Sequence, residues 1–425
     1  MSYGDSFRGF EMGILDPELV SLLEAALARL GRRASGLRAR VLARLAVALY
    51  HTGDSAPRRR ALSDESLRVS RRARDAASEL AALYSRQWAI WGPDTVADRL
   101  LAAGEMVRLA ERLGDAEMRF HAHRFRFMDL LEQGTSAALG RELATCEQLA
   151  AQLRQPYYRW YVDTFLGLQA FLAGRFDEYE RLAQQAAAIG QQAQNQNVMQ
   201  IFGIQMFALR REQGRLAELR DAISGFIAAY PHIPWGAALA VVCAETGDAE
   251  GARAELDRLA VDDFAAVPRQ TFWLAAMAAL GDVCAMLGDT DRAPVLYAQL
   301  RPFESLNVTL APGAACSGST ARVLGRLSAA LGQWDRAQRH FERALQRNRR
   351  LAAPQFIAHT QAQYGEMLLA RGAAADRGRA SDLIADAVAT YRRLGMATAA
   401  DRAHALSRRA RPPRGVRVVR ARRSG

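Results

Sequence analysis

The sequence predicts an all-α fold, a right-handed α-solenoid of about nine helix pairs. The first observation is a glycine-centred turn that recurs roughly every 40 residues, the range of helical repeats. The second is a small residue seven positions before most of these glycines, with an apolar residue one position earlier. Such spacing is typical of one face of a helix and contradicts the alternation of a strand. The turn glycines are Gly53, Gly92, Gly134, Gly174, Gly214, Gly247, Gly288, Gly332 and Gly372.

The array begins with a capping helix after an irregular lead-in of residues 1–15. Asp16, Pro17 and Glu18 form a strong helix start, because an acid can cap the first turn and proline suits the first helical position. We therefore expect the solenoid to span 16–406, with a first helix from Pro17 to Leu30. Solenoid ends are commonly atypical in this way.

Small residues in the first helix of each pair should let the second helix pack closely. Phe127 and Phe207 break this pattern, so their two units should pack differently. The positions that satisfy it are Ala46, Ser85, Gly167, Ala240, Gly281, Gly325 and Gly365.

The unit around Gly332 resembles a tetratricopeptide repeat at nearly every signature position. It carries Leu324-Gly325, then Gly332-Gln333-Trp334-Asp335, then Ala337, Phe341 and Ala344. A tetratricopeptide unit has 34 residues, whereas these units mostly run longer. We therefore expect extended helices or longer turns between units.

Two segments interrupt the helical pattern near the C-terminus. Asn307 to Gly318 is rich in glycine, alanine and proline, and we expect it to be the longest interior loop. Residues 407–425 contain eight arginines and no acid, which accounts for eight of the twelve net positive charges. Such a composition cannot build a core, so we expect a disordered arginine-rich tail that contributes nothing to stability.

The residue types present exclude several functions. The chain contains no lysine, so neither a Schiff base nor a standard phosphate-binding P-loop is possible. The four cysteines are far apart, and His121 and His123 point in different directions on a helix, so we expect no metal site and no cofactor. No catalytic residues are suggested by spacing, and we expect a non-enzyme. With no membrane-spanning run and no signal peptide, we expect a cytoplasmic protein without a membrane partner.

A concave groove is the candidate binding site. In tetratricopeptide arrays the first helix of each unit lines the groove, and counting back 13, 10, 6 and 3 residues from each glycine gives the inward positions. These positions hold Arg40, Tyr50, Arg86, His121, Arg124, Tyr161, Arg211, Arg322, Arg326 and His359, with the acids Glu79, Asp282 and Glu366. The excess of arginine indicates either a groove for acidic peptides or carboxylate termini, or simply an arginine-rich chain.

Four of these residues should test the groove directly. We expect Arg124, Tyr161, Arg322 and Arg326 to be partly exposed and free of internal ion pairs. The aromatic run Tyr157, Tyr158, Trp160 and Tyr161 is interpreted either as packing between repeats or as a binding surface.

From about Asp16 to Leu406 the chain resembles the tetratricopeptide-like C-terminal region of large actinobacterial signalling ATPases. Those proteins place an AAA- or STAND-type ATPase, sometimes preceded by a cyclase-like domain, before the repeats, and some end in a LuxR-type DNA-binding domain. The most specific stretches are Arg38–Arg40 with the helix to Tyr50, Arg154–Tyr161, Phe207–Gly214 and Ala314–Cys316. Without lysine there is no ATPase, and nothing after Leu406 resembles a DNA-binding module.

The resemblance implies the sensor-like part of a bacterial transcriptional or signalling regulator. We expect a non-enzymatic scaffold for protein–protein interaction, or a sensor module, that binds a partner segment in its groove. The alternative is a nucleic-acid-associated regulator whose arginine tail contacts phosphates without sequence preference.

Overall fold

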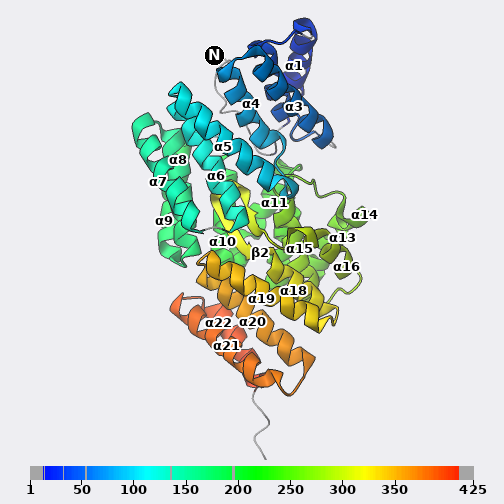
Figure 1. Ribbon diagram of the computed structural model, residues 1–425. Helices are drawn as coiled ribbons and strands as arrows, with labels where there is room; N and C mark the ends of the chain where they lie inside the picture. The colour runs from blue at the N-terminus through cyan, green and yellow to red at the C-terminus, as the bar shows by residue number, and fades with distance from the viewer. Residues whose placement is uncertain are drawn as a thin grey trace, which may run out of the picture.

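The computed structural model describes Gly13 and residues 15–31, 33–52, 55–134, 136–193 and 197–410, and these ranges are almost entirely helical. The N-terminal half comprises α1 (Pro17–Leu30), α2 (Gly36–Ala48), α3 (Ala56–Ala73), α4 (Ala76–Ala89), α5 (Val96–Leu113), α6 (Ala116–Gln133), α7 (Ser136–Leu153), α8 (Pro156–Leu172), α9 (Phe176–Gln192) and α10 (Val198–Gln213). Nearly all consecutive helices pack against each other. The predicted all-α helical-repeat solenoid is confirmed (Figure 1).

The C-terminal half contains the remaining helices and one hairpin. It comprises α11 (Arg220–Ala229), α12 (Trp235–Glu245), α13 (Ala249–Leu259), α14 (Val261–Phe264), α15 (Trp273–Leu287), α16 (Ala293–Leu300), β1 (Asn307–Leu310), α17 (Ala311–Ala314), β2 (Ala315–Ser319), α18 (Thr320–Ala330), α19 (Trp334–Arg350), α20 (Pro354–Arg371), α21 (Asp376–Arg393) and α22 (Ala397–Ala410). Short 3-10 helices occupy Pro93–Thr95, Leu216–Leu219 and Arg301–Phe303.

The turn glycines lie between helices, as predicted. Seven of them have positive φ angles of 64° to 89°, a region that glycine enters without a side-chain clash. Gly92 also separates two helices, but its φ of −173° is ordinary extended backbone. Gly53 lies outside the described residues.

Close approach at the small positions is also confirmed. A β-carbon built on Gly325 would lie 2.9 Å from the ring of Phe341, and one on Gly365 would lie 2.6 Å from Ile384. In both cases the contact comes from the second helix of the same pair. These glycines therefore set the distance between paired helices.

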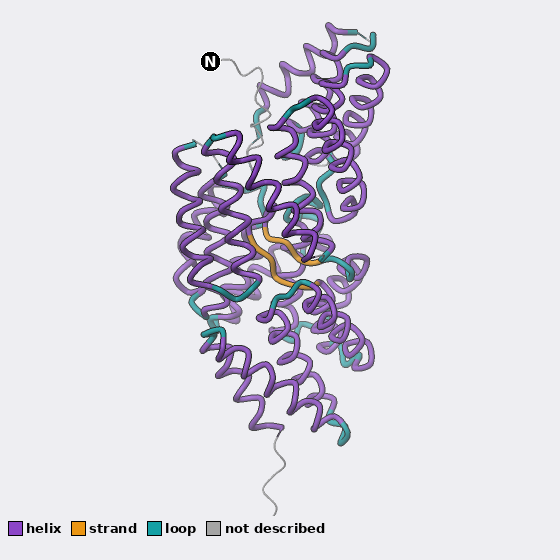
Figure 2. The backbone as a smooth tube through the Cα atoms, turned by 60° about the vertical axis from the view of Figure 1, so that its left-hand side comes forward, coloured by secondary structure: helices purple, strands orange, loops and turns teal. Residues whose placement is uncertain are grey.

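The segment predicted as the longest interior loop is instead an antiparallel β-hairpin, β1–α17–β2, so that prediction is wrong. The hairpin lies in the middle of the molecule with helices on both sides (Figure 2), and its residues Asn307, Val308, Ala314 and Cys316 are buried. Asn307 Nδ2 donates to Leu131 O at 2.9 Å. The hairpin fits this interior because Gly313 and Gly318 lack side chains. A β-carbon on Gly313 would lie 2.4 Å from Phe165, and one on Gly318 would lie 2.9 Å from Phe356.

Three successive turn glycines also form the contact between the two halves. Gly134 lies against Arg347 and Asn307, Gly174 against Leu394, and Gly214 against Thr398. Side chains of the C-terminal half also donate to backbone carbonyls at the ends of the N-terminal helices, since Gln355 Nε2 donates to Phe171 O at 2.7 Å in a buried contact. The C-terminal half therefore packs across the ends of the N-terminal helix pairs (Figure 1).

This contact predicts unequal effects for two otherwise identical substitutions. Gly214→Ala and Gly332→Ala both place alanine at a positive φ, 71° and 67°, which costs about 1–2 kcal/mol. At Gly214 the new methyl group would also lie 2.4 Å from Thr398 Oγ1, whereas at Gly332 no atom lies within 4 Å. We expect Gly214→Ala to lose about 1–3 kcal/mol more in urea unfolding, because overpacking adds to the backbone cost. Equal losses would show that the contact between the halves relaxes freely.

The two ends of the array match the sequence only in part. Asp16 caps α1 by accepting a hydrogen bond from Leu19 N at 2.9 Å, as expected. At the other end, α22 runs from Ala397 to Ala410, past the expected boundary at 406. The rest of the arginine tail, 411–425, lies outside the described residues, and its expected lack of effect on stability stays a prediction.

Candidate functional site

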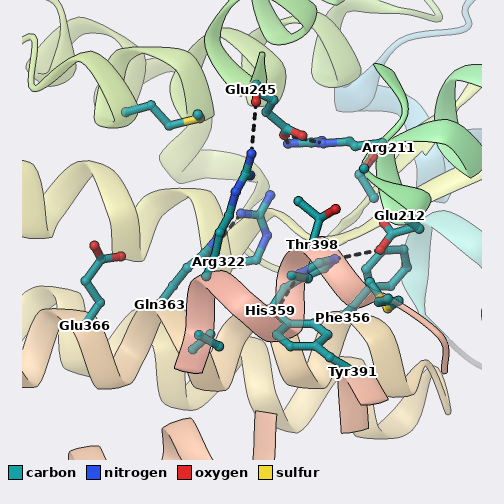
Figure 3. A pocket seen from close by; sticks show the side chains of 18 of the residues that line it. Arg211, Glu212, Glu245, Arg322, Phe356, His359, Gln363, Glu366, Tyr391 and Thr398 are labelled. Atoms are coloured by element: carbon teal, nitrogen blue, oxygen red, sulfur yellow. Dashed lines mark hydrogen bonds and ion pairs between the residues drawn. The ribbon is translucent and has the colours of Figure 1, made fainter. Parts of the chain in front are cut away.

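A pocket of about 250 Å³ opens where the two halves meet, and we call it the junction pocket. Its walls come from α10, α12, α15, α18, α20, α21 and α22, together with Ser317 of the hairpin. Figure 3 shows Arg211 beside Glu245 at the top of the view and Glu212 beside His359 below. The pocket brings together four predicted groove residues, Arg211, Arg322, Arg326 and His359.

One wall of the junction pocket is built around Asp282, which is 2 % exposed. Arg322 donates to both carboxylate oxygens at 2.9 and 2.7 Å, and Arg326 donates to Oδ1 at 2.7 Å. Arg211 Nη2 donates to Oδ2 at 3.3 Å and also pairs with Glu245 at 2.8 Å. Three guanidiniums from α10 and α18 therefore converge on a single carboxylate of α15.

Electrostatics fix the charge state of this wall. Burial alone would raise the pKa of Asp282, but the guanidiniums of Arg322 and Arg326 lower it well below its usual range. Asp282 therefore stays ionised at physiological pH and holds the three arginines in place.

The prediction that Arg322 and Arg326 are free of ion pairs is wrong, and the predicted partial exposure holds for Arg326 but not for Arg322. Arg322 is 6 % exposed, and both side chains are held by Asp282 of the neighbouring helix pair. The spacing placed them on the correct face of α18, but it could not show that an acid from α15 meets them there. Replacing these arginines would change stability, so they are poor probes of binding.

The opposite wall is a line of hydrogen bonds between three helices. His359 Nε2 faces Glu212 Oε2 at 2.8 Å, and His359 Nδ1 faces the Tyr391 hydroxyl at 2.8 Å. Burial raises the pKa of Tyr391, so its hydroxyl stays protonated and can donate. The line joins α10 to α20 and α21, which makes the pocket sensitive to the packing of the two halves.

The lining of the pocket also includes two exposed charged side chains, Arg402 and Glu366. Arg402 of α22 is exposed and donates to a backbone oxygen, Glu245 O, at 3.0 Å. Glu366 of α20 is exposed on the other side. These two residues can therefore be changed to probe binding with little effect on folding.

Three other predicted groove residues meet elsewhere, between α4, α6 and α8. His121 and Arg124 are buried, which contradicts the expected exposure of Arg124, and Tyr161 is half-buried with its ring 4.4 Å from the Arg124 guanidinium. The aromatic run at 157–161 contributes to this packing, since Tyr158 and Trp160 are both buried. The packing interpretation of that run therefore holds for these two residues.

The last three predicted residues do not join either cluster. Tyr50 is buried, and its hydroxyl accepts a hydrogen bond from Thr271 N at 2.9 Å. Arg86 pairs with Asp64 at 2.5 Å, and Arg40 is exposed on α2. The hairpin fills the centre of the molecule, so the ten residues do not line one continuous groove.

Counting inward positions from the turn glycines missed Glu212, Glu245, Tyr391 and Arg402. Tyr391 and Arg402 lie on α21 and α22, which a rule limited to the first helix of each pair excludes. The available signal was Gly395, another turn glycine with a φ of 72°, which separates these two helices.

Two further properties concern metals and membranes. Within the described residues, no group of three or more histidine, cysteine, aspartate or glutamate side chains is placed to hold a metal ion. The helices in the described ranges also include none that is both long and apolar enough to cross a membrane.

Comparisons with known proteins leave the family open. No protein-family model matches the sequence, and no curated protein matches it. A solved "Circular tandem repeat protein with novel repeat topology and enhanced subunit contact surfaces" is similar over 92 % of this chain and 86 % of its own, with 12 % sequence identity and a TM-score of 0.15. At such a TM-score the two chains do not superpose as one shape, so the fold described above rests on this chain's own helices and turns.

Proposed function

We propose that this chain is a non-enzymatic interaction and sensor module of a bacterial transcriptional or signalling regulator. In this proposal a protein partner inserts an acidic group into the junction pocket. The resemblance of residues 16–406 to the repeat region of signalling ATPases supports the regulatory role. The clustering of four guanidinium groups on one side of the pocket supports the choice of an acidic partner.

The charges that carry the proposal can be followed residue by residue. On one side of the pocket, Arg211 is balanced by Glu245, while Arg322 and Arg326 share Asp282. Arg402 donates to a backbone oxygen only. On this side four guanidiniums face two carboxylates, and Glu212 and Glu366 elsewhere on the lining bring the pocket to four arginines and four carboxylates. An incoming carboxylate can accept two parallel hydrogen bonds from one guanidinium, and Arg402 has no carboxylate partner among the described residues.

The position of the hairpin directs the partner to the pocket. Helices surround β1 and β2 on both sides, and the hairpin's buried residues occupy the interior that an open solenoid would offer to an extended peptide (Figure 2). The junction pocket is reached from outside, past Arg402 and Glu366. A short acidic segment suits this entrance better than a long strand or helix.

Fluorescence anisotropy with a labelled glutamate-rich peptide tests the proposal. We expect this peptide to bind, and its glutamine counterpart to bind at least about tenfold more weakly, because hydrogen bonds between charged groups contribute about 1.5–3 kcal/mol. Arg402→Glu should weaken binding of the acidic peptide by a similar factor. Arg377→Glu is the matched control, since Arg377 is exposed on α21 and does not line the pocket.

Equal binding by the acidic and neutral peptides, or equal losses in the two variants, would refute the proposal. Labelled duplex DNA of the same charge tests the alternative function. Strong, salt-dependent DNA binding that Arg402→Glu does not change would favour phosphate contacts by the arginine-rich tail.

A further inference from the structure

Arg124 of α6 lies inside a cage of aromatic rings. Its guanidinium carbon is 4.4 Å from the ring centre of Tyr161, 4.6 Å from Phe125 and 5.5 Å from Trp88. The residue is 0 % exposed. We call these rings, together with that of Tyr84, the aromatic cage. Rings over the faces of a guanidinium stabilise its charge but give its N–H groups no acceptor.

Other arginines buried as deeply do have strong acceptors. Arg99 lies 2.7 Å from carboxylate oxygens of both Asp129 and Glu132. Arg59 donates to the backbone oxygen of Ala89 at 2.7 Å. Within the described parts of the chain, no ion pair includes Arg124, and its hydrogen-bond partner is the neutral hydroxyl of Tyr84. The charge of Arg124 is therefore not balanced by the side chains around it.

The neighbouring tyrosines cannot supply the missing negative charge. Burial raises the pKa of Tyr84, and it raises the pKa of Tyr157 well above the usual value. Both phenols are therefore protonated at physiological pH. A buried cation in such surroundings is costly unless an anion approaches it.

Two N–H groups of Arg124, at Nε and Nη2, have no hydrogen-bond acceptor among the described residues. These two nitrogens lie on the same edge of the planar guanidinium, and their N–H bonds point in parallel. This edge is the fork with which arginine holds a carboxylate, and a single halide can also accept both hydrogens.

We propose that the Nε and Nη2 edge of Arg124 binds a small anion, a chloride ion or a carboxylate of formate size. The anion must be small, because Arg124 has no exposed surface and is enclosed by other side chains. The nearby side chains of Tyr157 and Tyr161 on α8 are only half-buried. The anion would sit where α4, α6 and α8 meet, so it would hold three successive helix pairs together. This site is independent of the junction pocket.

Thermal unfolding at constant ionic strength tests the proposal. Sodium gluconate is the background salt, because the gluconate ion is too large for the cage, and sodium chloride or sodium formate replaces it stepwise. We expect the midpoint of the full-length protein to rise and then saturate, as it does when one ligand binds the folded state. A larger rise of the unfolding midpoint in formate than in chloride would indicate a carboxylate site. A larger rise in chloride would indicate a halide site.

Arg124→Met removes the charge and keeps an unbranched apolar side chain in the cage, and its midpoint should not respond to either salt. Arg126→Met is the matched control on the same helix, since Arg126 already pairs with Glu142 at 2.8 Å, and its response should equal that of the wild type. Should Arg124→Met fail to fold, wild-type crystals soaked in bromide provide the second measurement, with anomalous density expected at the Nε and Nη2 edge. A wild type without a saturable response and without bromide density overturns the proposal, as does an equal response in Arg124→Met.

Discussion

Replacing Asp282 with alanine will destabilise the folded chain by about 3–5 kcal/mol, the usual cost of removing one partner from a buried ion pair. Asp282 accepts hydrogen bonds from Arg322, Arg326 and Arg211, so its loss leaves three guanidiniums without their shared acceptor. Arg326 loses its one carboxylate, whereas Arg211 keeps Glu245. Urea unfolding followed by tryptophan fluorescence measures the loss.

The control for this experiment is Asp335→Ala, the same chemical change at a side chain that is 89 % exposed. We expect it to cost less than about 0.5 kcal/mol. Combining Asp282→Ala with Arg322→Met should recover part of the lost stability, because it removes one of the unpaired buried cations. A loss below about 1 kcal/mol in the single variant, or no recovery in the double variant, would show that water solvates the arginines once Asp282 is gone.

The helix pairs could be predicted from the sequence because their determinants are local. Gly332 ends one helix at a positive φ, and Gly325 lies seven residues earlier, where Phe341 packs against it. Each of these needs only the contacts within one unit, and repeats of similar spacing reinforce the pattern. The same local reasoning placed Asp16 at the start of α1.

The hairpin was missed because its stability comes from distant residues. Asn307 is held by Leu131 O, and Gly313 fits beside Phe165, where a β-carbon would lie 2.4 Å from the ring. Composition alone makes the segment 307–318 look like a loop, since glycine, alanine and proline are common in loops. These same small residues fit the narrow space between the two halves, where they are buried.

The candidate site was predicted in part for a similar reason. Helical spacing placed Arg322, Arg326, Arg211 and His359 on inward faces, and these four do meet in the junction pocket. What spacing could not supply was the pairing between helices, because all four side chains are held by partners from other helices. The helices that complete the pocket reach it from far along the chain, as the contact between Arg402 and Glu245 shows.

The stability of this protein should fall as the pH rises from about 5 to 8, and Asp129 should be the main cause. Asp129 and Glu132 both lie 2.7 Å from the single guanidinium of Arg99, and Arg99 and Asp129 are fully buried. Burial raises the pKa of Asp129 to about 8, and the Arg99 guanidinium opposes only part of that rise. One cation between two carboxyl groups favours a state in which only one of them is ionised.

The direction of the effect follows from proton binding. In the unfolded chain Asp129 loses its proton near pH 4, but in the folded chain it keeps the proton up to about pH 8. Between these values the folded state holds the extra proton. The free energy of unfolding therefore falls with rising pH by up to about 1 kcal/mol per pH unit, and the stabilising effect of the raised pKa is lost above pH 8.

Asp129→Asn isolates this effect, because asparagine keeps the shape of the protonated side chain and cannot ionise. The difference in unfolding free energy between variant and wild type, measured in urea at pH 5, 6, 7 and 8, should move steadily in favour of the variant. Taking the difference cancels the contributions of distant titrating groups such as His340 and Asp163, and what remains belongs to Asp129 together with Glu132, which shares Arg99 with it. A difference that stays constant from pH 5 to 8 would mean that Asp129 is already ionised in the folded state, with Arg99 compensating for both carboxylates.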